Sequence, residues 1–188
     1  SPVRAMRSGV SKAVGELGPA LAQPEVLAAL MQGLQDEDHR VRTRAAQALG
    51  KLEAVDAIPA LEQCLLKDSA RRVRWRAAEA LRVLDARTAQ SAFIAAMTDA
   101  YSSVRLECIR ALASWKVSES IPHIAEALQD EIRRVRRAAA KALGDLGDYR
   151  ALAPLRDVLW QDPEESVRLA ATRALGQLRQ NLKDTAEA

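Results

Sequence analysis

The sequence predicts an all-α solenoid, in which pairs of helices stack one after another along the chain. One segment, VRTRAAQALGKL, begins at Val41 and returns as VRWRAAEALRVL, VRLECIRALASW, VRRAAAKALGDL and VRLAATRALGQL. The anchor valines lie 32, 31, 31 and 32 residues apart, and self-similarity at a period of this size is typical of stacked helical repeats. A weaker copy, MRSGVSKAVGEL, begins at Met6. The later anchors are Val73, Val104, Val135 and Val167.

The repeated segment has the pattern of an amphipathic helix. Apolar residues stand at positions 0, 4, 7, 8 and 11 counted from the anchor, which places them on one face of a helix. The small residues at positions 4 and 7 allow another helix to approach closely. Each copy therefore predicts the first helix of a pair. In the first complete copy the stripe consists of Val41, Ala45, Ala48, Leu49 and Leu52.

A second helix is expected within each period. Residues 58–66 and 121–128 are the clearest examples, and Pro59 and Pro122 stand near their starts, where a proline removes no backbone donor that the helix needs. Two helices of about ten to thirteen residues and two short turns fill the period. Glycines near the ends of first helices predict left-handed caps. These glycines are Gly50, Gly144 and Gly147.

Two charged residues keep a fixed place in every complete copy. An aspartate stands five residues before the anchor, and an arginine follows the anchor directly. Together with the pattern VRxxAAxALGxL, this recurrence resembles the HEAT repeat, in the short bacterial and archaeal form that is also seen in phycobilin lyases. The aspartates are Asp36, Asp68, Asp99, Asp130 and Asp162. The arginines are Arg42, Arg74, Arg105, Arg136 and Arg168.

The resemblance covers nearly the whole chain and carries expectations about its fold. It implies a right-handed α-solenoid (an α–α superhelix) of about five to six helix pairs, with first helices on the convex side and second helices on the concave side. It also implies that the five aspartates and five arginines form a structural ladder between neighbouring repeats. The copy at Met6 departs from the pattern, because no aspartate stands five positions before it.

One domain, residues 1–188, is expected, because this length is ordinary for a single domain and one period runs through it. The expected repeats are about 1–35, 36–67, 68–98, 99–129 and 130–161, followed by a terminal helix at 162–182. Apolar residues make up 48% of the chain but aromatic residues only 3%, which favours helix stacking through alanine over a globular core. The chain begins Ser-Pro rather than Met, as a cut piece or a tag remnant would.

No catalytic motif is present, and the sequence predicts a protein that is not an enzyme and holds no metal and no cofactor. It has no phosphate-binding glycine loop and no nucleophile motif. Neither His39 nor His123 precedes a glutamate, unlike the His-Glu pairs of related di-iron hydroxylases. Cys64 and Cys108 are expected to be small buried residues in a reducing compartment. No apolar run could span a membrane, so we expect a cytoplasmic protein without a membrane partner.

Arginine clusters recur with the period and could follow a phosphate backbone along one edge of the repeats. Against this, one arginine of each cluster belongs to the ladder pattern, acids are interleaved, and the net charge is only +3. No aromatic row is available to stack bases. Nucleic acid or another polyanion is therefore an alternative partner and not the leading one. The clusters are Arg40, Arg42 and Arg44; Arg71, Arg72, Arg74 and Arg76; and Arg133, Arg134, Arg136 and Arg137.

The second helices carry the residues that we expect to bind a partner. Outside the apolar stripe their side chains differ between repeats, as in a groove tailored to one ligand and also as in an unconstrained surface. Among the tryptophans, Trp115 stands at a stripe position and is expected in the core, Trp75 is expected to be partly exposed, and Trp160 is a candidate contact residue. The candidate binding residues are Gln63, Lys67, Thr98, His123, Gln129, Arg156 and Trp160.

These observations lead to a functional hypothesis with two alternatives. The leading one is a non-enzymatic scaffold or adaptor that binds a protein or peptide on the concave face of the solenoid. A bilin lyase subunit or chromophore-handling chaperone is the first alternative, and it rests on the family resemblance alone. Polyanion binding along the arginine edge is the second. The identity of the partner and the oligomeric state stay open.

Overall fold

The computed structural model describes residues 23–187, and it describes side chains as far as residue 181. Throughout this part of the chain the regular structure is helical, without strands. The predicted all-α fold is confirmed, while the early copy at Met6 lies outside the described residues. The α-helices are α2 (Pro24–Gly33), α3 (His39–Lys51), α4 (Ile58–Lys67), α5 (Arg71–Val83), α6 (Gln90–Ala95), α7 (Ser102–Ser114), α8 (Ile121–Glu126), α9 (Arg133–Leu146), α10 (Leu152–Gln161) and α11 (Glu165–Glu187).

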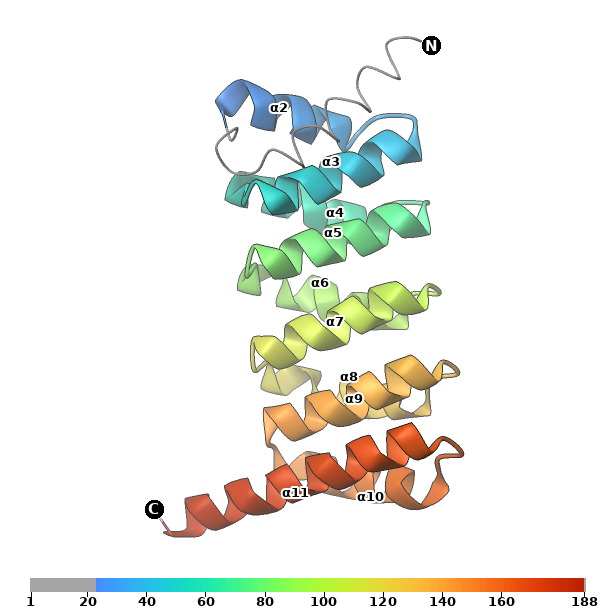
Figure 1. Ribbon diagram of the computed structural model, residues 1–188. Coiled ribbons are helices and arrows are strands. Elements are labelled where there is room, and N and C mark those ends of the chain that lie inside the picture. Colours follow the sequence, from blue (N-terminus) through green and yellow to red (C-terminus); the bar gives the residue numbers. More distant parts are fainter. Residues whose placement is uncertain (1–22, 188) are drawn as a thin grey trace. The chain divides into compact units, whose positions relative to one another are not determined.

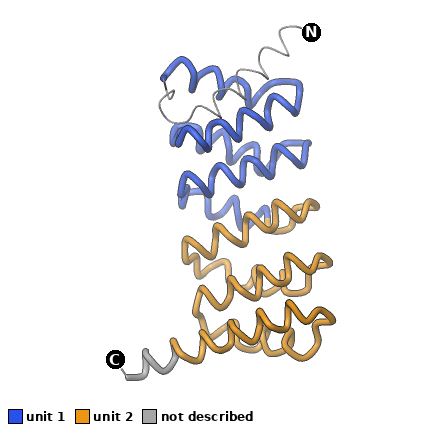
Figure 2. The backbone as a smooth tube through the Cα atoms, in the orientation of Figure 1, with its two compact units in different colours: residues 1–96 blue, residues 97–188 orange. Residues whose placement is uncertain are grey.

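The chain divides into two compact units, residues 1–96 and 97–188 (Figure 2). In the first unit α3 and α5 pack side by side, and α4 packs behind α5 (Figure 1). In the second unit α7, α9 and α11 pack side by side, with α8 behind α9 and α10 behind α11. Each unit therefore has a layer of first helices backed by a layer of second helices. That residues 1–188 form one domain stays a prediction.

Most of the apolar stripe of the first helices is buried, as its spacing requires. In α9, Val135, Ala139 and Leu143 are fully buried, and Ala142 is 3% exposed. Since α9 packs against α7, α8 and α11, every side of this stripe meets another helix. Removing apolar area from water, at about 25 cal/mol per Å², is the main favourable contribution to the stacking of these helices.

The glycines of the first helices have two different roles. Gly147 follows α9 with a φ of 76°, as a left-handed cap should. The caps predicted at Gly50 and Gly144 are wrong, because both residues lie inside their helices. A Cβ atom on Gly50 would lie 2.8 Å from the Cβ of Ala80, and one on Gly144 would lie 2.7 Å from the Cα of Ala174. These two glycines therefore allow the following first helix to approach closely.

The left-handed position after a first helix accepts residues other than glycine. Glu53, Asp85 and Lys116 have φ angles of 53°, 48° and 57°, and each stands at the same distance from its anchor as Gly147. The N–H of the next residue closes each turn by donating to a carbonyl in the last turn of the helix, as Ala54 does to Leu49 at 3.1 Å. The position in the repeat, and not the residue type, therefore determines where these helices end.

Short 3-10 turns precede the second helices α4, α6, α8 and α10, which differ in length. Proline stands in the first turn of α4 and of α8, as predicted. α6 and α8 have six residues each, which is shorter than expected, and each continues as a 3-10 turn, η4 (Ala96–Thr98) or η6 (Ala127–Gln129). The terminal helix is longer than expected, because α11 continues from residue 182 to Glu187.

Candidate functional site

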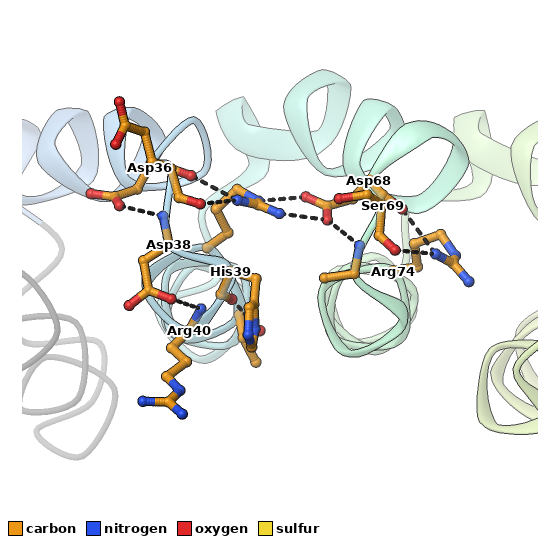
Figure 3. Close-up of polar contacts among 11 residues, drawn as sticks. Asp36, Asp38, His39, Arg40, Asp68, Ser69 and Arg74 are labelled. Carbon is orange, nitrogen blue, oxygen red and sulfur yellow. Dashed lines mark hydrogen bonds and ion pairs between the residues drawn. The ribbon is translucent and has the colours of Figure 1, made fainter.

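A row of arginine and aspartate side chains ties the turn before one first helix to the turn before the next. In the first unit the Nε and Nη2 atoms of Arg42 donate to the two carboxylate oxygens of Asp68, at 2.6 and 2.9 Å. The Nη1 atom of Arg42 donates to the backbone oxygen of Asp36 at 2.8 Å, and Figure 3 follows these contacts from Asp36 to Arg74. One guanidinium group therefore joins two repeats.

The second unit repeats this arrangement twice. Arg105 donates to the two carboxylate oxygens of Asp130 at 2.6 and 2.8 Å, and Arg136 donates to those of Asp162 at 2.6 and 3.1 Å. The hydrogen bond to Asp130 raises the pKa of Arg105, and the one to Asp162 raises that of Arg136. Paired, charge-assisted bonds of this kind are stronger than bonds between neutral groups.

Each aspartate of the row also fixes the turn that precedes its own first helix. The Oδ1 atom of Asp68 accepts the backbone N–H of Ala70 at 2.8 Å, and that of Asp162 accepts the N–H of Glu164 at 2.9 Å. The side chain of Asp68 is 7% exposed and that of Asp162 is 4% exposed. These buried carboxylates therefore have both a charged partner and a backbone donor, as buried charges require.

The other arginines and aspartates of the row form hydrogen bonds within the turn that precedes their own first helix. The Nη1 atom of Arg74 donates to the backbone oxygen of Asp68 at 2.9 Å, and that of Arg168 to the backbone oxygen of Asp162 at 2.7 Å. Asp99 accepts the N–H of Tyr101 at 2.7 Å. That all ten residues form one ladder along the chain stays a prediction.

The stability of the second unit should decrease in acid. Burial raises the pKa of the Asp162 carboxyl, but the hydrogen bonds from Arg136 and the Glu164 amide, with the charges of Arg136 and Arg168, outweigh it and lower the pKa overall. The unfolded chain therefore binds more protons than the folded chain as pH falls. We expect the urea midpoint to be level from about pH 7 to pH 5 and to fall below about pH 4. An Asp162→Asn variant should show a smaller fall, and an equal fall would contradict this assignment.

All seven candidate binding residues are exposed, and all lie on the second helices or the turns that end them. In the first unit, Gln63 and Lys67 stand one turn apart on α4. In the second unit, Arg156 and Trp160 stand one turn apart on α10. The segment η6 packs against α10, so the structure brings neighbouring second-helix segments together there. The others lie on η4, α8 and η6, and they are Thr98, His123 and Gln129.

The three tryptophans have different environments. Trp160 is 79% exposed, the largest value among the exposed apolar side chains of the described residues. Trp115 is 6% exposed and belongs to the core. The guanidinium carbon of Arg76 lies 4.2 Å from the centre of the half-buried Trp75 ring, and sequence reasoning missed this cation–π contact. It also missed the exposed apolar residues Leu66 and Tyr149, at 46% and 68%, because neither breaks the repeat pattern.

Neither histidine belongs to a metal-binding cluster in the described part of the chain. His39 and His123 are both exposed. Among residues 23–181, no group of three or more His, Cys, Asp or Glu side chains is placed to hold a metal ion. No helix in the described part of the chain is both long enough and apolar enough to cross a membrane.

The arginine clusters are only partly available to a polyanion. Within these clusters, Arg42 and Arg136 are engaged by the aspartates of the row. Arg76 pairs with Glu79, and Arg133 lies 3.5 Å from Glu164. The arginines of these clusters that remain largely exposed are Arg40, Arg71, Arg72, Arg133, Arg134 and Arg137.

The two cysteines are expected to be unreactive in the folded protein. Cys64 is 9% exposed, and burial raises the pKa of its thiol to about 11. At pH 8 only about one Cys64 thiol in a thousand is then ionised. Cys108 is fully buried, and burial raises its pKa further. With a thiol-specific reagent at pH 8, neither should react in the time that labels both in urea, and rapid labelling of native Cys64 would contradict this.

The packed helix pairs and the recurrent aspartate–arginine row define an α-solenoid repeat protein. A family model described as "HEAT repeats" matches residues 5–82 and 91–176. The chain therefore belongs to the HEAT-repeat family, and the predicted fold class is confirmed.

This chain is similar to a phycocyanobilin lyase subunit in sequence and to several solved structures in fold. It is 42% identical over 60 residues to the phycocyanobilin lyase subunit alpha of Synechococcus elongatus, a match that covers 32% of this chain and 20% of that protein. The complex of CpcE and CpcF of phycocyanin lyase from Nostoc sp. PCC7120 is similar in structure, with a TM-score of 0.60, 22% identity, and coverage of 89% of this chain and 88% of that one. A designed armadillo repeat protein in complex with the peptide (KR)4 has a TM-score of 0.65, 19% identity, and coverage of 93% and 90%.

Proposed function

We propose that this protein is a non-enzymatic binding module that presents the exposed side of its second helices, the side expected to be concave, to a protein or peptide partner in the cytoplasm. The observation that carries the proposal is the exposure of Trp160, one helical turn after Arg156 on α10. Tryptophan and arginine are the residue types enriched in binding hot spots. Exposing 79% of a tryptophan costs free energy in water, and a partner that covers the ring removes this cost.

The packing of α10 against its neighbour supports the proposal. Leu155 and Val158 of α10 are buried, and α10 packs against α11, so its exposed side is held in a fixed orientation. A surface that is ordered before binding loses less conformational freedom when a partner arrives. The designed armadillo protein in complex with the peptide (KR)4 is one protein of similar fold that binds a peptide.

The test uses the whole tagged chain as bait in extracts of its source cells. The first variant combines Trp160→Ala with Arg156→Glu, and the second combines Gln63→Glu with His123→Glu. A matched control combines Arg133→Glu with Arg134→Glu, which changes exposed residues of a first helix. We expect the partner retained by the natural chain to bind at least about tenfold more weakly to the first variant and unchanged to the control. Unchanged binding to both second-helix variants would contradict the proposal.

A role in handling a bilin chromophore is the second candidate. The observation in its favour is the 42% identity over 60 residues to a phycocyanobilin lyase subunit, and such a role would include enzymatic activity. Incubation of the chain with phycocyanobilin and an apo-phycobiliprotein tests it by absorbance and by mass. A chromophore adduct that forms only with the chain present would support this candidate, and the absence of both an adduct and a spectral shift would dismiss it.

A further inference from the structure

Two first helices, α5 and α7, each contain an ion pair between the third and the sixth position after the anchor. In α5, Arg76 donates to Glu79 at 2.5 Å. In α7 the order of the charges is reversed, and Arg110 donates to Glu107 at 2.7 Å. A cation at either of these positions is therefore neutralised by an acid of its own helix.

The helices α9 and α11 have lost the acid of this pair and kept the cation. The third position is Ala138 in α9 and Ala170 in α11, while the sixth is Lys141 and Arg173. Lys141 and Arg173 are both exposed, and neither forms an ion pair in the described part of the chain. A carboxylate that neutralises them therefore has to come from outside these two helices.

Arg137 adds a third cation to this group. It is exposed one turn before Lys141 on α9, and like charges one turn apart on a helix repel each other. α9 and α11 pack side by side and are nearly in register, because a Cβ atom on Gly144, at position 9, would meet Ala174, at position 7. Arg173 therefore lies beside Lys141 on a helix whose axis is about 8–10 Å away. Arg137, Lys141 and Arg173 form the basic face.

An apolar side chain borders the basic face. Leu169 stands one turn before Arg173 on α11 and is 49% exposed. Its equivalent in α9 is Arg137, which is exposed although helices pack on both sides of α9, so this position points outward whatever lies next to the helix. The nearest acids on the same sides of α9 and α11 are Asp145 and Glu165. They lie beyond Lys141 and before Leu169, at the ends of the surface.

This combination of side chains favours a protein segment over a nucleic acid. α9 and α11 contain no aromatic residue that could stack a base, and a phosphate backbone has no apolar group to cover Leu169. An acidic amphipathic helix presents carboxylates one turn apart with apolar residues beside them. The second helices of this unit match such a ligand less well, because Glu126 and Asp157 oppose the charge of Arg156.

We propose that the outward side of α9 and α11 binds an acidic amphipathic helix of a partner protein. Two carboxylates one turn apart on that helix pair with Arg137 and Lys141, a third reaches Arg173, and an apolar side chain covers Leu169. This ligand differs from the partner of the second helices, so either proposal can fail without the other.

A designed peptide tests the surface directly. The probe is fluorescent and stapled into a helix, with glutamates spaced three and four residues apart along one side and leucines next to them. Fluorescence anisotropy with the whole chain should show saturable binding in about 50 mM salt, where charges are only partly screened. Lys141→Glu combined with Arg173→Glu should weaken binding at least about tenfold, and Leu169→Ser should weaken it about threefold.

The matched control combines Lys51→Glu with Arg72→Glu. It reverses two exposed charges of first helices in the other unit and changes the net charge of the chain by the same amount, yet it should leave binding unchanged. A probe with glutamine for glutamate should not bind. All of these variants alter exposed side chains, so the helical circular dichroism signal and the urea midpoint should stay those of the natural chain and separate loss of binding from loss of folding.

Four outcomes would overturn the proposal. The first is absence of binding at millimolar probe. The second is an equal loss of binding in the control and in the double variant of α9 and α11, which would show attraction to net charge alone. The third is equal binding of a probe with alanine in place of leucine. The fourth is tighter binding of a DNA duplex that the double variant releases, because a nucleic acid would then be the better ligand.

Discussion

Replacing Arg136 with alanine is expected to lower the free energy of unfolding by about 3 kcal/mol. The substitution removes both bonds to the carboxylate of Asp162 and the bond to the backbone oxygen of Asp130, at 2.6, 3.1 and 2.9 Å. It leaves the carboxylate of Asp162, only 4% exposed, without its nearest cation. A buried charge that loses its partner is far more costly than a missing surface pair. Urea unfolding followed by circular dichroism measures the change.

Arg133 provides the matched control. It lies on the same helix and is 3.5 Å from Glu164, but its side chain is 65% exposed and that of Glu164 is 41% exposed. Arg133→Ala should therefore change the free energy of unfolding by no more than about 0.5 kcal/mol. If both alanine variants lost the same free energy of unfolding, the aspartate–arginine row would stabilise the protein no more than surface ion pairs do.

The same substitution should have opposite effects at two glycines. Gly144→Ala is expected to destabilise the protein by about 1–3 kcal/mol, because its Cβ would lie 2.7 Å from a backbone atom of Ala174. Gly176→Ala is expected to stabilise it by about 0.5–1 kcal/mol, because the new Cβ would meet nothing within 4 Å and alanine has the higher helix propensity. Urea midpoints of the two variants and the natural chain give both values.

These two glycines occupy the same position in successive repeats and are each other's control. Helix propensity acts equally on both, so the difference between the variants isolates the contact with the following helix. A Gly144→Ala variant as stable as Gly176→Ala would mean that α9 and α11 do not approach as closely as the structure places them.

The repeat pattern alone predicts most of the fold for a simple physical reason. A stripe with the period of a helix, repeated at equal intervals, has few ways to be buried other than by stacking. Trp115 illustrates this, because it takes the place of a stripe leucine and is 6% exposed. The bonds of Arg42, Arg105 and Arg136 likewise join residues whose fixed spacing is visible in the sequence.

Features that depend on where helices end and what covers them could not be predicted. Gly50 and Gly144 look like caps in the sequence, but their helices continue past them and need the glycine for close packing. The exposure of Trp160 could not be predicted for a related reason. Its place on a second helix is visible in the sequence, but whether a neighbouring segment covers the ring depends on the packing of α10.

Hydrogen exchange of the whole chain, with and without the partner that it retains from extracts, tests most directly whether the second helices form the binding surface. The account predicts that the partner slows amide exchange in α8, η6 and α10 and leaves α9 unchanged. Slowed exchange confined to the first helices, around the exposed Arg133 and Arg134, would contradict it.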